Sequence, residues 1–183
     1  MEFIQTNINI VITTLTLISH IVFVIGMLLL FMKREFRNWV YGVVNIHAKV
    51  ILIVIILGAM AGSYIQSLVI GFPPCELCWT QRLMLIPQLL VLVWAILKKK
   101  ANDIIMFLLP LSVIGAVVAL YQSFVQWGIG GSLLGCTSVG GDCAKIYVIE
   151  YGYITIPFMS FTIFVYLLAT TLIYYKSKNV GQN

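Results

Sequence analysis

Four cysteines are the residues of this sequence whose type and spacing suit redox chemistry. Cys75 and Cys78 form a C-x-x-C pair in the segment PPCELCWTQR, and Cys136 and Cys143 form a second pair in CTSVGGDC. A C-x-x-C pair is often redox-active when it begins a helix, because the helix N-terminus favours the thiolate that attacks disulfides. Proline is common at the first helical position. The two prolines before Cys75 therefore predict a helix that starts at this pair.

Arg82 follows Cys78 by one helical turn and lies on the same face of the predicted helix. Its guanidinium could stabilise a Cys78 thiolate or donate a hydrogen bond to a ligand carbonyl. The alternative is an arginine that extends to lipid headgroups, and the register with Cys78 favours the first interpretation. Trp79 could line the same ligand pocket, although an interfacial aromatic belt is the preferred interpretation. Gln81 lies on a neighbouring face and is interpreted as an interfacial polar residue.

The rest of the chain has the composition of a membrane protein. Of 183 residues, 61% are hydrophobic and 9% are charged, whereas soluble domains carry roughly 25% charged residues. Nucleic-acid binding is not indicated, because the basic residues behind the net charge of +5 cluster between apolar runs. Spanning a bilayer takes about 20 apolar residues. Runs of that length predict membrane helices at residues 8–32 and at about 50–70, 79–97, 104–125 and 153–175.

The basic clusters predict the orientation of these helices. They follow the first, third and fifth runs, so they share one membrane face if the helices alternate, and that face is cytoplasmic. The N-terminus and all four cysteines are then extracytoplasmic, and the C-terminus is cytoplasmic. Residues 1–10 lack a basic segment and the first run is long for a signal peptide, so we expect a retained helix. Residues 36–47 are expected to be an interfacial stretch or an early start of the second helix. The clusters comprise Lys33, Arg34, Arg37, Lys98, Lys99, Lys100, Lys176 and Lys178.

Two non-redox interpretations of the cysteines remain as alternatives. Disulfides persist outside the cytoplasm, but loops this short stabilise a fold by only about 2–2.5 kcal/mol. A zinc site would use C-x-x-C as a half-site; the six residues between Cys136 and Cys143 depart from the usual spacing, and we expect no metal. A redox interpretation accounts for more of the pattern than either alternative, because two disulfides on one membrane face can pass electrons to each other by thiol–disulfide exchange. A thiol pair at the bilayer surface further suggests a lipid-soluble electron acceptor, with quinone as the obvious candidate.

Other polar residues in the predicted helices have weaker functional signals. His20 and His47 have no partner visible in the sequence and are interpreted as structural. Tyr121 and Gln122 lie near the outer end of the fourth helix, from which a polar group could reach the thiol pair.

Three segments of this sequence resemble the disulfide bond formation protein B family, the membrane thiol–quinone oxidoreductases of bacteria. They are PCELCWTQR, the later pair in CTSVGGDC, and YGYITIPFMS, which is similar to the entry to the family's last helix. The cysteine order differs from that of the related vitamin K epoxide reductases. The resemblance implies an all-α integral membrane protein with a four-helix bundle core at 47–183. Residues 1–46 would be one additional N-terminal transmembrane helix and a linker. At the outer end of the fourth helix the family often has a histidine, where this chain has Gln122.

The resemblance also implies a mechanism. A secreted thioredoxin-fold oxidase, once reduced, would attack a Cys136–Cys143 disulfide, most directly at Cys136, and Cys143 would then exchange with Cys75. Cys78 would pass the electrons to menaquinone or ubiquinone, with Arg82, Trp79 and Gln122 at the quinone. The setting would be the bacterial plasma membrane. The rivals are a related enzyme that runs in the opposite direction and a non-catalytic membrane protein with structural disulfides or zinc.

Overall fold

The structure, a computed structural model, describes residues 2–98, 105–129 and 143–180. Its regular elements are all helical. In chain order they are α1 (Glu2–Met32), α2 (Arg34–Tyr64), the π-helical turn η1 (Ile65–Val69), α3 (Glu76–Leu97), the 3₁₀ turn η2 (Ile105–Phe107), α5 (Leu108–Gln126) and α6 (Ile156–Val180).

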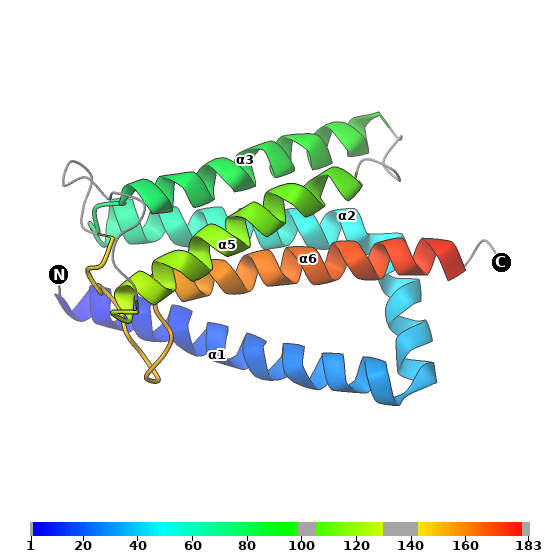
Figure 1. Cartoon of the computed structure of the whole chain (residues 1–183), viewed down its shortest axis with the longest axis horizontal. Helices are drawn as coiled ribbons and strands as arrows, with labels where there is room; N and C mark the ends of the chain where they lie inside the picture. Colours follow the sequence, from blue (N-terminus) through cyan, green and yellow to red (C-terminus); the bar gives the residue numbers. More distant parts are fainter. Residues whose placement is uncertain (1, 99–104, 130–142, 181–183) are drawn as a thin grey trace.

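Within the described residues, five helices are long and apolar enough to cross a membrane. This confirms the predicted all-α class and the five runs. Of the two alternatives predicted for residues 36–47, an early start of the second helix is confirmed, because α2 is helical from Arg34 onward. The first part of α2 crosses from the end of α1 to the bundle, and the rest of the helix runs along the bundle (Figure 1). Lys33, with φ −117° and ψ 115°, interrupts the helix between α1 and α2.

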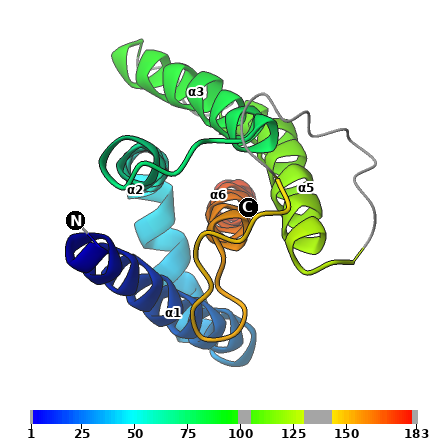
Figure 2. The same ribbon diagram turned by 90° about the vertical axis from the view of Figure 1, so that its left-hand side faces the viewer.

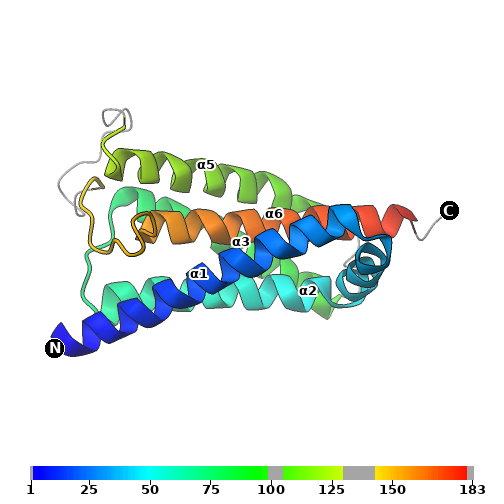
Figure 3. The ribbon, with the colours of Figure 1, turned by 90° about the horizontal axis from the view of Figure 1, so that it is seen from below.

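Helices α2, α3, α5 and α6 pack around a buried apolar core. Helix α6 packs against α2 and α5, and α3 packs against the same two helices on the other side of the bundle (Figure 2). Helix α1 lies outside this bundle and crosses diagonally over α2 and α6 (Figure 3). The largest fully buried apolar side chains are Leu52, Ile56, Leu92, Ile105, Leu108, Ile154, Phe164 and Leu167.

The cysteines that the structure describes lie at the end of the bundle that carries the N-terminus. The connections from α2 to α3 and from α5 to α6 meet there, and the C-terminus lies at the opposite end (Figure 1). Two turns shape these connections. Gly71 has φ +85° before the start of α3, and Gly152 has φ +79° before α6; both values are readily adopted by glycine. Helix α6 thus begins at Ile156, slightly later than the sequence predicted.

Gly115 of α5 lies directly against α6, because an added Cβ at this position would overlap the Phe164 ring. We predict that Gly115→Ala lowers the free energy of unfolding by about 1–3 kcal/mol, the usual range for overpacking. Thermal unfolding in detergent measures this loss. Gly26→Ala is the matched control, since a Cβ at Gly26 meets no atom within 4 Å. Equal melting of Gly115→Ala and wild type would contradict the predicted packing.

Candidate active site

The start of α3 fixes the geometry of the C-x-x-C pair. Cys75 is the N-cap of α3 with extended backbone, and its sulfur accepts a hydrogen bond from the Cys78 amide at 3.4 Å. The helix start predicted from the two prolines is therefore confirmed within a residue. Cys75 and Cys78 are free thiols, and their sulfur atoms lie 3.0 Å apart at hydrogen-bonding distance.

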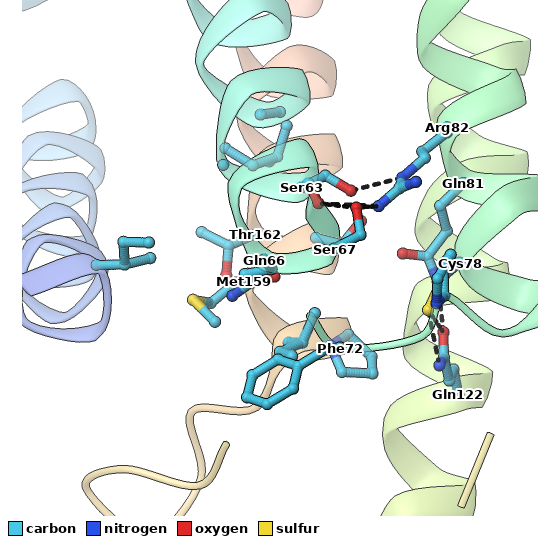
Figure 4. A pocket seen from close by; sticks show the side chains of 18 of the residues that line it. Ser63, Gln66, Ser67, Phe72, Cys78, Gln81, Arg82, Gln122, Met159 and Thr162 are labelled. Carbon is cyan, nitrogen blue, oxygen red and sulfur yellow. Dashed lines mark hydrogen bonds between the residues drawn. The ribbon is translucent and has the colours of Figure 1, made fainter. Parts of the chain in front are cut away.

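Gln122 of α5 links both sulfur atoms to the neighbouring helix. Its Nε2 lies 3.1 Å from Cys75 Sγ and 3.5 Å from Cys78 Sγ. Its Oε1 accepts a hydrogen bond from Gln81 Nε2 at 2.8 Å, and both glutamines are buried. The donation from Gln81 orients the Gln122 amide so that its NH₂ group reaches both sulfur atoms, and Oε1 also accepts a hydrogen bond from Cys78 Sγ at 3.9 Å. The structure thus brings Gln122 to the thiol pair (Figure 4).

Gln81 is a site residue that the sequence interpretation missed. It was assigned to interfacial polarity, but its side chain is only 5% exposed and it orients Gln122. A residue three positions after Cys78 also shares that cysteine's helical face, and this spacing was the available signal.

The two thiols differ in protonation and access. Cys75 is 4% exposed, whereas Cys78 is partly exposed. The hydrogen bond with Cys78, followed by burial, raises the pKa of Cys75 well above its ordinary value. Cys75 therefore keeps its proton at neutral pH, and Cys78 is the more available nucleophile of the pair.

Arg82 is buried and held by the end of α2. Its Nε donates to Ser63 Oγ at 2.7 Å, and its Nη2 donates to the Ser63 carbonyl and to Ser67 Oγ, each at 2.8 Å. The guanidinium carbon also lies 5.0 Å from the centre of the Tyr64 ring and 5.3 Å from that of Trp79. With 6% of its surface exposed, Arg82 does not extend to headgroups. Its Nη1 donates no hydrogen bond to any residue in the described part of the chain.

Sequence reasoning also missed Ser63 and Ser67. Their spacing of one helical turn at the outer end of the second apolar run was the signal for a polar face there. The turn η1, which contains Ser67, is π-helical. Single π-turns of this kind occur frequently at functional sites.

A cavity of about 410 Å³ connects these groups. It falls in the range of about 300–1,000 Å³ that is typical of small-molecule sites. Cys78, Gln81, Arg82 and Gln122 all contribute to its lining, and so do residues of α1, α2 and α6. Trp79 lies outside this lining, and its ring is 48% exposed over the Arg82 guanidinium.

Cys143 lies beside the C-x-x-C pair. It is disulfide-bonded and 1% exposed, and it packs in one buried cluster with Cys75 and Leu77. Gln126 Nε2 donates to the Lys145 carbonyl at 3.0 Å, which anchors the segment after Cys143 to the end of α5. Cys136, the other predicted site cysteine, lies outside the described residues.

The two histidines lie away from the thiol pair. His20 of α1 has two partners that the sequence did not reveal, namely Thr162 Oγ1 at 2.7 Å and the Tyr153 hydroxyl at 3.3 Å. His47 Nδ1 lies 3.3 Å from the carbonyl of Val43 in its own helix. Across the described ranges, no three His, Cys, Asp or Glu side chains are placed to hold a metal ion.

Taken together, these features define a multi-pass helical membrane protein with a dithiol, an oriented amide and a buried arginine at one end of its bundle. Residues 46–174 match the family described as "Disulfide bond formation protein DsbB". The chain belongs to this family, and its role is in disulfide bond formation, which implies oxidoreductase activity. Helix α1 and the first turns of α2 lie outside the match.

Curated relatives from Bacillus agree with this assignment. The "SPbeta prophage-derived disulfide bond formation protein B" of Bacillus subtilis (strain 168) is 38% identical over 127 residues, which cover 69% of this chain and 84% of the relative. "Probable disulfide formation protein C 1" of Bacillus anthracis is 33% identical over 120 residues, or 66% of this chain and 86% of the relative. "Disulfide bond formation protein C" of Bacillus subtilis (strain 168) is 33% identical over 115 residues, or 63% and 83%. No solved structure matches the chain.

The difference between the two thiols gives a direct prediction. When the protein with a free C-x-x-C pair is treated with iodoacetamide near neutral pH, Cys78 should be alkylated before Cys75, because Cys75 is buried and its pKa is raised. Peptide mass spectrometry over time measures both rates. Thr80→Ala, a change at a partly exposed neighbour, should leave the order unchanged. Faster modification of Cys75 would contradict the assignment of Cys78 as the more available nucleophile.

Proposed function

We propose that this protein is a membrane thiol–quinone oxidoreductase that reoxidises an extracytoplasmic thioredoxin-fold disulfide oxidase. The observation that carries the proposal is that Cys78 and Arg82 line one cavity within a membrane-spanning bundle. A nucleophilic sulfur and a guanidinium donor on the same cavity suit a ligand that accepts electrons and carries a carbonyl oxygen.

The polar groups that line the cavity suit a quinone, either menaquinone or ubiquinone. Arg82 Nη1 is a charged donor without a partner among the described residues, and it is available to a carbonyl oxygen. Gln122 and Gln81 add a buried amide network around the sulfur atoms. A bound quinone would supply the oxidising capacity, taking up two electrons and two protons as it becomes the quinol. Arg82 would orient the carbonyl, and Cys78 would face the ring.

The cysteines would pass electrons by thiol–disulfide exchange. A thiolate of the reduced oxidase attacks a Cys136–Cys143 disulfide at Cys136 and forms a mixed disulfide, which releases Cys143 as a thiolate. The second thiol of the oxidase resolves the mixed disulfide, so the oxidase leaves with its own disulfide. Cys143 would then attack a Cys75–Cys78 disulfide at Cys75, which forms a Cys143–Cys75 disulfide and frees Cys78. Cys136 would attack Cys143, re-form the Cys136–Cys143 disulfide and release Cys75, and the Cys75–Cys78 dithiol would return to its disulfide by passing its electrons to a bound quinone. Packing of Cys143 with Cys75 in one cluster supports this order of exchange. In total, one dithiol becomes a disulfide and one quinone becomes a quinol.

Quinone reduction by the purified protein tests this function. With a reduced thioredoxin-fold partner, wild-type protein should turn over, and Cys78→Ser should abolish turnover because the sulfur that faces the cavity is lost. Arg82→Gln should raise the KM for quinone about tenfold, equivalent to about 1.4 kcal/mol of binding. Thr80→Ala serves as the control. Wild-type protein without turnover, or a Cys78→Ser variant with full turnover, would refute the proposal.

The proposed function requires the cysteine end of the bundle to face outward, with the C-terminus in the cytoplasm. In a variant without native cysteines, Ile146→Cys should react with a membrane-impermeant maleimide in intact cells. Lys176→Cys, at an exposed residue near the other end, should react only after the membrane is opened. The positions of the basic clusters support this orientation. Labelling in the reverse pattern would place the thiols in the cytoplasm and contradict it.

A further inference from the structure

One stripe that runs along α2 into η1 faces the cavity. Gly58, Gly62 and Gln66 follow each other at helical spacing, and all three line the cavity. Glycines spaced in this way usually allow two membrane helices to approach closely. Here a Cβ added at Gly58 or at Gly62 would meet no atom within 4 Å. The glycines therefore widen the cavity instead of making a helix contact.

Gln66 is a polar side chain that lacks a protein partner at this place. Its surface is 8% exposed, and its amide makes no hydrogen bond to any residue in ranges 2–98, 105–129 and 143–180. Figure 4 shows it on the side of α2 toward Met159 and Thr162, whereas Arg82 approaches from the other side. Neither the nitrogen nor the oxygen of this amide is fully buried without a partner, so the amide borders the cavity that Gln66 lines. A ligand with a polar acceptor atom at this position would receive a hydrogen bond from it.

Helix α1 closes the cavity on this side. Ile12, Thr16 and Ser19 belong to the lining. Polar contacts hold α1 to α6: Ser19 Oγ lies 2.9 Å from the Tyr166 hydroxyl, and His20 Nε2 lies 2.7 Å from Thr162 Oγ1. The family match begins at residue 46, so this wall comes from a part of the chain that the match does not include.

We propose that the part of the cavity lined by Ile12, Thr16, Ser19, Gly58, Gly62 and Gln66, here called the α1 lobe, binds the far part of the quinone. Gln66 donates a hydrogen bond to the ring carbonyl remote from Arg82. The first part of the prenyl chain lies on the flat surface of Gly58 and Gly62, covered by α1. This inference rests on the thiol–quinone oxidoreductase function proposed above.

Side chains added to the glycine surface test the chain position. Gly58→Leu and Gly62→Leu should each raise the KM for a prenylated menaquinone about tenfold, because the added side chain occupies the space of the chain. The KM for dimethylnaphthoquinone, which has the ring without a prenyl chain, should stay near wild type. Gly26→Leu is the matched control, since Gly26 also has no atom within 4 Å of its Cβ position but lies outside the cavity lining.

Gln66→Met tests the carbonyl contact, because it keeps the side-chain length and removes the donor. It should raise the KM about tenfold for both quinones, in contrast to the glycine variants. Melting temperatures in the absence of quinone should match wild type for all variants. If a leucine variant fails to fold, Gly58→Ala and Gly62→Ala replace it, with a smaller rise in KM expected for the prenylated quinone alone.

The outcomes separate this inference from the function on which it rests. One contrary outcome is that wild-type protein turns over while the glycine variants keep the wild-type KM for the prenylated quinone. That result would show that the α1 lobe does not bind the prenyl chain, and it would leave the oxidoreductase function intact. An equal rise in KM for Gly26→Leu would also overturn it. Wild-type protein that reduces neither quinone would refute the proposed function itself.

Discussion

A buried arginine in a membrane bundle is the constraint on which the arrangement of this site depends. Arg82 is only 6% exposed, and a buried guanidinium needs polar partners; Ser63 of α2 and Ser67 of η1 bind its Nε and Nη2. These bonds fix α3 against the outer end of α2, including its π-helical turn. They leave Nη1 without a partner among the described residues, on a side chain that lines the cavity. The need of a buried guanidinium for polar partners thus positions both α3, which carries the thiols, and the Arg82 donor that is available to a ligand.

The same physics explains why polar side chains join the helices throughout this apolar bundle. Lipid gives little hydrophobic drive for one helix to associate with another, so interhelical hydrogen bonds and close packing contribute instead. Ser112 Oγ donates to Gln88 Oε1 at 2.9 Å between α5 and α3, and Gln81 donates to Gln122 between the same helices. The Gln122 bond lies at the thiol pair, so a contact that holds the bundle together also orients the amide that donates to sulfur.

Much of this arrangement could be predicted from the sequence, because it depends on local sequence patterns. Apolar runs predicted the helices, two prolines predicted the start of α3, and the position of Gln122 near the end of the fourth run predicted its approach to the thiols. The contacts of Arg82 with Ser63 and Ser67 were not predicted, since they depend on which face α2 turns toward α3. The contact of His20 with Thr162 was missed for the same reason. Helical period gives the spacing of residues on one helix, whereas the rotation of each helix against its neighbours is set by packing.

The capping geometry gives the two cysteines of the pair different surroundings. Cys75, as the N-cap, is buried in the cluster that includes Cys143, whereas Cys78, one turn later, is partly exposed and packs against that cluster; both cysteines line the cavity. In the proposed function this pair would receive electrons from Cys143 by thiol–disulfide exchange and pass them to a quinone, so its two sulfur atoms would react with different partners. Cys143 would react with Cys75, which precedes the helix. The quinone would react with Cys78, which lies in the first turn of the helix. The start of a single helix would therefore hold both sulfur atoms in place for the two half-reactions of the proposed function.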